Sequence, residues 1–189
     1  GDWDYFNYQI GATDVVIMGN GSDVMKKWDG TTFANLGGNP PNMKSVTLHS
    51  ERIWGTGVKA TPDSAYYSDT IGKGHTGPEN WTISEDGAGV VNVPTWDGGV
   101  CIGISNIFSD VVIFKTNNIF RVVGTYPSVY EVKQVYSSVG AIAEKTIQFR
   151  LWYLLQEKDT LVNMCLRGYQ DLRDSVAGVP IHEPRGVLK

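Results

Sequence analysis

The sequence contains few residues that could bind a metal or form a covalent crosslink. It has 2 cysteines and 3 histidines among 189 residues. Cys101 and Cys165 each lie inside an apolar run, so we expect buried free thiols rather than a disulfide, and two cysteines alone cannot form a zinc site. Composition therefore gives no reason to expect a metal or another cofactor.

Charge is also scarce, and its sign is wrong for a nucleic-acid-binding protein. Charged residues make up 19% of the chain, and the net charge is −4. Such a chain lacks the positive field that attracts phosphate, so we expect no sequence-specific binding of nucleic acid. No apolar run reaches the roughly 18 residues that a membrane-spanning helix needs, so we expect no insertion into a membrane.

The chain does contain enough apolar material for a folded core. Hydrophobic residues make up 41% and aromatic residues 11% of the sequence, which is typical of a folded domain and not of a disordered chain. The apolar residues occur in short runs bounded by glycine, asparagine, aspartate and serine, the pattern of β-strands joined by tight turns. This pattern predicts an all-β fold.

The turn residues predict where these strands reverse. Asn20-Gly21 and Asp29-Gly30 suit the positive φ of hairpin turns, Glu51-Arg52 and residues 116–118 are expected at two further tips, and residues 137–145 are the one stretch compatible with a helical turn. The predicted strands cover residues 15–18, 24–28, 46–48, 53–54, 65–67, 90–93, 100–104, 111–114, 119–123, 130–136, 147–149, 151–155 and 161–166.

A degenerate repeat groups these strands into antiparallel meanders. The second strands of four predicted units lie near Met25, Ile53, Val112 and Trp152, and a glycine-rich insert at residues 71–89 separates the second unit from the third. Three or four strands in roughly 40 to 50 residues is the spacing of propeller blades. We therefore expect a propeller-like array of antiparallel meander blades, either closed or incomplete within the chain. An irregular β-sandwich is the alternative.

The predicted repeat also indicates how the chain is divided and where several of its side chains lie. Residues 1–166 are expected to form the blades, and residues 167–189 a C-terminal arm or linker. Lys115 and Asn117 are predicted at a solvent-facing turn. The tryptophans expected to supply apolar area between blades are Trp28, Trp54, Trp81 and Trp152.

No catalytic or metal-binding constellation emerges from the sequence. His49, His75 and His182 are far apart, and none has a cysteine, histidine or carboxylate at ligand spacing. The stretch from Gly72 to Gly77 lacks the order of a phosphate-binding loop, and Asp159, Asp171 and Asp174 lack the alternation of a calcium loop. The sequence thus predicts a protein that is not an enzyme, with no catalytic, cofactor or metal residues.

Mobile inserts on β scaffolds often make contacts with partners. The insert at residues 71–89 is therefore a candidate contact loop. The residues expected to make such contacts are Tyr66, Tyr67, Lys73, His75 and Trp81.

A succession of short motifs occurs along the chain. They are residues 20–33 (NGSDVMKKWDGTTF), 49–54 (HSERIW), 65–69 (AYYSD), 79–81 (ENW), 111–124 (VVIFKTNNIFRVVG) and 138–140 (SVG). In this order they resemble the β-propeller-like tail, nozzle or head–tail accessory proteins of tailed bacteriophages and prophages. In those proteins a blade ends in an aromatic–Asp-Gly-Thr–aromatic turn, a strand with Arg and Trp precedes a Tyr-Tyr-Ser-Asp segment, and a strand pair of the form hhhFKxNxI follows, where h is a hydrophobic residue.

The resemblance implies a non-enzymatic structural protein of the virion, assembled in the host cytoplasm. Its partners would be other virion proteins and copies of itself.

Two other functions remain open at this stage. Ser68-Asp69 followed by Trp81 resembles a distorted Asp-box of glycosidase propellers, and exposed aromatic side chains such as Tyr66 and Tyr67 suit sugars. This favours a glycan-binding or glycosidase-like propeller that contacts a host surface, although a glycosidase also needs two positioned carboxylates. A protein-interaction propeller of cellular origin is the third possibility.

Overall fold

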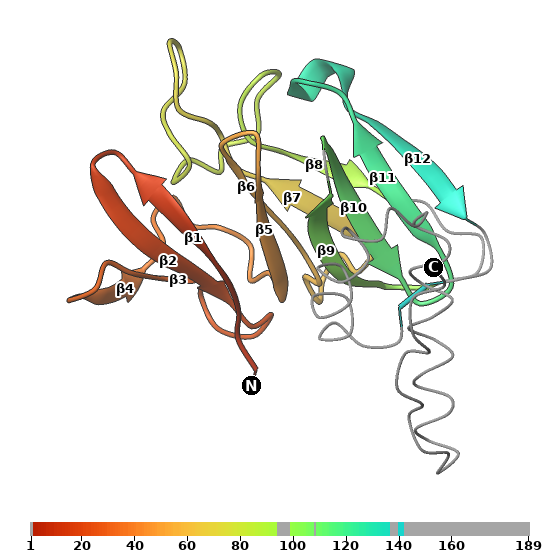
Figure 1. The fold of residues 1–189 in the computed structure, drawn as a ribbon, viewed down its shortest axis with the longest axis horizontal. Coiled ribbons are helices and arrows are strands. Elements are labelled where there is room, and N and C mark those ends of the chain that lie inside the picture. The colour runs from red at the N-terminus through yellow and green to blue at the C-terminus, as the bar shows by residue number, and fades with distance from the viewer. Residues whose placement is uncertain (1, 94–98, 108, 137–139, 142–189) are drawn as a thin grey trace, which may run out of the picture.

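The computed structural model describes residues 2–93, 99–107, 109–136 and 140–141. These residues form three four-stranded sheets, each made of four consecutive antiparallel strands (Figure 1). Sheet I contains β1 (Asp4–Ile10), β2 (Thr13–Gly19), β3 (Lys26–Trp28) and β4 (Phe33–Asn35). Sheet II contains β5 (Ser45–His49), β6 (Arg52–Thr56), β7 (Ser64–Tyr67) and β8 (Gly89–Asn92). Sheet III contains β9 (Cys101–Ile107), β10 (Asp110–Lys115), β11 (Ile119–Val123) and β12 (Glu131–Tyr136).

The expected all-β class is therefore confirmed. A 3₁₀ turn at Pro127–Val129 connects β11 to β12. Within the described residues, no helix has the length and apolar character needed to cross a membrane.

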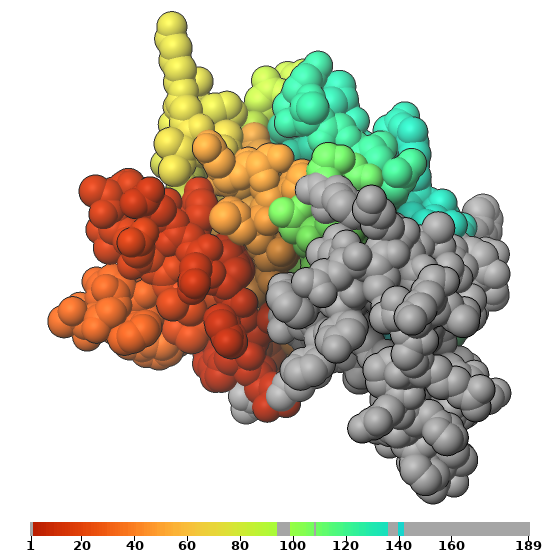
Figure 2. Space-filling view, viewed as in Figure 1, coloured from red at the N-terminus to blue at the C-terminus, as the bar shows by residue number. Residues whose placement is uncertain are grey.

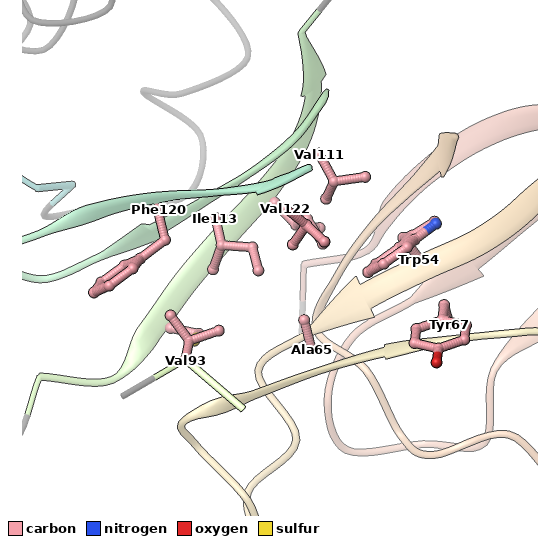
Figure 3. Packing of buried hydrophobic residues seen from close by; sticks show 10 residues of the cluster. Trp54, Ala65, Tyr67, Val93, Val111, Ile113, Phe120 and Val122 are labelled. Carbon is pink, nitrogen blue, oxygen red and sulfur yellow. The ribbon is translucent and has the colours of Figure 1, made fainter. Parts of the chain in front are cut away.

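Two apolar layers hold the three sheets together in series. Between sheets I and II, residues such as Tyr8, Ile17 and Met43 form one buried cluster. Between sheets II and III, Trp54 and Tyr67 on one side face Val111 and other residues of sheet III on the other (Figure 3). Sheet II thus buries both of its faces, which is why every residue of β6 is buried.

Sheet III also buries apolar residues on both faces. Successive side chains of a strand point to opposite faces, and β10 has apolar residues at every position from Val111 to Phe114. Val111 and Ile113 belong to the cluster shared with sheet II, whereas Val112 and Phe114 belong to a further cluster that includes Ala141. An uninterrupted apolar run is the expected sequence of such a strand.

Polar bonds join the first strands of the three sheets. The Asp4 carboxylate of β1 accepts hydrogen bonds from the Ser45 hydroxyl (3.0 Å) and the Val46 N–H (2.7 Å) of β5. The Ser45 hydroxyl oxygen in turn accepts one from the Ile104 N–H of β9 (3.3 Å). All these atoms are buried, so the network fixes how the three sheets sit relative to one another.

The structure confirms most of the expected strands and corrects the first unit. The second strands near Ile53 and Val112 are β6 and β10. The second strand of sheet I is β2, so the placement near Met25 was wrong: Met25 is buried just before β3 and its carbonyl accepts the Leu36 N–H. The strand β1 was not predicted at all.

One hairpin tip is shifted by a residue. Ser50 and Glu51 both have positive φ, 49° and 59°, and they form the tip between β5 and β6 in place of the expected Glu51-Arg52. His49 and Arg52 pair across the hairpin. Arg52 is therefore a buried strand residue, and this places its guanidinium inside sheet II.

Two side-chain assignments were also wrong. Lys115 is fully buried rather than solvent-facing: its ammonium donates to Asp63 Oδ1 (3.0 Å) and to the Val93 carbonyl (2.9 Å). Trp28 is 44% exposed rather than packed between sheets. Trp54 is fully buried between sheets as expected, and Cys101 is a buried free thiol.

Several expectations fall outside the described residues. These are Trp152, Cys165, His182, the strands predicted after residue 146 and the boundary at residue 166. Most of the stretch at residues 137–145 also lies there.

Candidate interaction surface

The glycine-rich insert is the loop between β7 and β8, residues 68–88. Part of it projects from the body of the molecule as the narrow yellow column in Figure 2. Lys73 of this loop is exposed. The loop is thus displayed as a contact loop would be, on a scaffold of three packed sheets.

Asp69 organises the first half of this loop. Its buried carboxylate accepts hydrogen bonds from the Thr70 N–H (2.8 Å) and from the N–H and hydroxyl of Thr76 (both 3.0 Å). His75 Nδ1 lies 2.7 Å from Asp69 Oδ1. A carboxylate at the end of β7 therefore closes residues 70–76 into a compact turn.

These bonds also perturb the acid–base behaviour of Asp69. Burial by itself would raise the pKa of this carboxyl, but the hydrogen bonds from Thr76, Thr70 and His75 outweigh burial and lower the pKa to about 2. The hydrogen bonds of the folded loop therefore stabilise the ionised form of Asp69 over its protonated form. Asp69 and His75 are separated by six residues, which matches no standard ligand spacing, so the sequence did not indicate this pair.

Arg52 fixes both ends of the same loop from within sheet II. Its guanidinium donates to the carbonyls of Ser68 (2.8 Å), Gly87 (2.6 Å) and Asp86 (2.8 Å), and Nη1 lies 3.9 Å from Asp69 Oδ1. The planar guanidinium can satisfy several carbonyls at once. The two motifs therefore have a structural role, because the arginine of Arg-Ile-Trp binds the Ser-Asp end of Tyr-Tyr-Ser-Asp.

The second half of the loop is attached to sheet I. The Glu79 carboxylate pairs with the Lys27 ammonium (2.7 Å) and accepts the Gly37 N–H (2.6 Å). Gly38 has φ +74°, and a Cβ at this position would lie 1.6 Å from the Glu79 carbonyl oxygen. Only glycine permits this close approach.

The five expected contact residues do not form one surface. Tyr67 is buried between sheets II and III in contact with the ring of Trp54, so it offers no surface to a partner. Tyr66 and Trp81 are partly buried against the cluster between sheets I and II. Lys73 is exposed and His75 is held by Asp69, so Lys73 is the most accessible of the five.

A larger candidate surface was missed by the sequence reasoning. Sheet I lies at one end of the series of sheets (Figure 1), and only one of its faces packs against sheet II. The opposite face, called here the outer face of sheet I, exposes the side chains of Tyr5 (65%), Trp28 (44%) and Phe33 (59%). The alternation of β1 would have indicated this face, had β1 been recognised.

A groove of about 790 Å³ adjoins this face. Trp28 lines it beside the polar side chains of Asn7, Gln9, Asp14 and Asp29. An exposed aromatic ring surrounded by amides and carboxylates can contact an apolar surface or a polyhydroxylated ligand.

The described residues contain no candidate metal site. No group of three or more histidine, cysteine, aspartate or glutamate side chains lies close enough to hold an ion in that part of the chain. Comparison with protein-family models and with curated proteins found no match for the chain.

Proposed function

We propose that this chain is a non-enzymatic structural subunit that assembles through the surfaces of its sheets. The observation that carries the proposal is the outer face of sheet I, where three aromatic side chains are exposed on a terminal sheet. Monomeric soluble proteins rarely expose contiguous apolar patches above a few hundred Å², and larger patches mark interaction sites. The proposal predicts particles larger than one chain in solution.

The sheets, in this proposal, are blades of a propeller-like array. Support comes from the first strands, because β5 contacts both β1 and β9 and polar bonds link Asp4, Ser45 and Ile104 across them. Inner strands that neighbour one another are expected where blades surround a common axis. A β-sandwich packs two sheets against each other, whereas here three meanders pack in series.

The biological setting we propose is the virion of a tailed phage, as a tail, nozzle or head–tail component. The support is the succession of motifs, to which the Arg52 clamp and the turn around Asp69 now give structural roles. Other virion proteins and further copies of the chain are the proposed partners, with assembly in the host cytoplasm.

Electron microscopy together with mass spectrometry of purified particles tests this function. We expect ring-shaped or stacked oligomers of the purified chain, and the chain present in intact particles at a fixed copy number. A chain that is abundant in the lysate but missing from purified particles would contradict the virion assignment.

Glycan binding is a second candidate, favoured by the groove beside Trp28. Its lining combines an exposed indole with the side chains of Asn7, Gln9 and Asp14, which suits stacking on a sugar ring and hydrogen bonding to its hydroxyls. A glycan array tests this function, with Trp28→Ala as the variant that should lose binding. Absence of both binding and hydrolysis in the intact chain would remove it.

A further inference from the structure

The strand pairing of sheet I defines its outer face in three rows. Tyr5, Met18, Lys26 and Asn35 are successive partners across the four strands and form one row. Two contacts of Lys26 agree with this placement: its ammonium donates to Asn35 Oδ1 (2.5 Å) and lies 5.9 Å from the centre of the Phe33 ring.

The middle row is mainly apolar, and the third row is polar. Asn7, Val16, Trp28 and Phe33 are partners in the middle row. Gln9 pairs with Asp14 in the third row. The face therefore has an apolar centre, a cation at one end of the strands and an anion at the other.

The extent of this face is close to what a dimer interface requires. Four strands of these lengths cover roughly 300 Å² in projection, and protruding aromatic side chains raise the accessible area to about 600 Å². Two such faces in contact would bury about 1,200 Å², which is the lower end of the range for specific interfaces.

We propose that the outer face of sheet I binds the same face of a second copy of this chain, about a two-fold axis that runs across the strands. Such an axis places the first row of one copy over the third row of the other, and it places the two middle rows over each other. Trp28 and Phe33 of one copy then pack on the middle row of the other. The Lys26 end of one copy meets the Asp14 end of the other, so charge as well as apolar surface is self-complementary.

This inference rests on the proposed structural function and specifies its first contact. The test is sedimentation equilibrium of the full chain over a range of concentrations. Wild type should form a dimer at low concentration, as the first species on the way to the larger oligomers proposed above. Phe33→Lys should weaken the dimer about 30-fold, because it places a charge in the apolar middle row of the interface. Tyr126→Lys is the matched control, because Tyr126 is exposed (52%) between β11 and β12, and it should leave the dimer unchanged.

A charge exchange tests the orientation. Lys26→Asp should weaken the dimer by up to about 5-fold, and Lys26→Asp combined with Asp14→Lys should restore it. A wild-type chain that stays monomeric, or a dimer unaffected by Phe33→Lys, would overturn the inference, whether the face is free, covered by the chain itself or used for a glycan. A monomer that still occurs in purified particles would overturn this contact alone, whereas a dimer absent from particles would leave the contact and overturn the virion assignment.

Discussion

The carboxylate of Asp69 offers the most direct quantitative test of how the β7–β8 loop is stabilised. Asp69→Asn keeps the size of the side chain but replaces one acceptor oxygen with an NH₂ group. The wild-type oxygens face the N–H groups of Thr70 and Thr76, the Thr76 hydroxyl and His75. The amide therefore loses accepted bonds and directs a donor toward other donors.

The lowered pKa gives the magnitude. The pKa of Asp69 falls from an ordinary value of 3.8 to about 2 in the folded chain, a difference that corresponds to about 2 kcal/mol. Because the folded pKa lies below the unfolded one, this stabilisation is complete above about pH 5 and is lost as the pH falls through about 4 toward 2. We expect Asp69→Asn to lower the free energy of unfolding by about 2 to 3 kcal/mol at pH 7.

Urea denaturation of wild type and variant at a series of pH values measures this effect. The difference between the two proteins should become small near pH 2, where folded wild-type Asp69 is about half protonated, and should approach zero below that pH. Asp86→Asn is the control: Asp86 is exposed in the same loop and binds Arg52 through its carbonyl, not its carboxylate. A difference that is independent of pH, or one that Asp86→Asn reproduces, would refute the reasoning.

Four further substitutions, at three positions, test the contacts that join the sheets and the β7–β8 loop. Lys115→Met nearly keeps the volume of this buried side chain but removes the donor to the Val93 carbonyl and the cation beside Asp63, so it should lower the free energy of unfolding by about 1 to 3 kcal/mol. Lys115→Ala should cost about 2 kcal/mol more through the cavity that it leaves; thermal denaturation compares the two. Ser45→Ala removes the hydroxyl between Asp4 and Ile104 and should cost about 1 to 2 kcal/mol, measured by urea denaturation. Gly38→Ala should cost at least about 2 kcal/mol because its φ is positive and the Glu79 carbonyl occupies the space of a Cβ; calorimetry that shows an unchanged melting temperature would contradict this.

The strands that could be predicted from the sequence are those with strong apolar runs and clear turns. The β10–β11 hairpin illustrates this, because the run from Val111 to Phe114, the turn at 116–118 and the run from Ile119 to Val123 agree closely with the structure. Apolar residues occupy consecutive positions of these strands because both faces of sheet III are buried. Local pattern and tertiary environment point the same way here.

Lys115 shows where local pattern fails. A lysine followed by Thr-Asn-Asn has the composition of an exposed turn, yet its ammonium reaches Asp63 and the Val93 carbonyl of a neighbouring segment. These partners are far away in the sequence, and nothing near Lys115 identifies them. The same holds for Arg52, whose acceptors near Gly87 follow it by more than thirty residues. Buried charges of this kind depend on partners that only the fold brings together.

The outer face of sheet I was missed for a different reason, and that reason bears on the proposed assembly. Trp28 was assigned to a buried position because a large aromatic residue is usually buried, and that inference is correct for Trp54. Along β1, apolar residues of the inner face alternate with Tyr5, Asn7 and Gln9 of the outer face, so β1 lacks a strong apolar run. A face that is half polar in sequence but aromatic at its centre is what an interface between separately folded chains requires. If a second copy covers this face, both errors have one explanation. Trp28 is then buried only in the dimer, and the polar residues of β1 lie at the border of an interface rather than in a core.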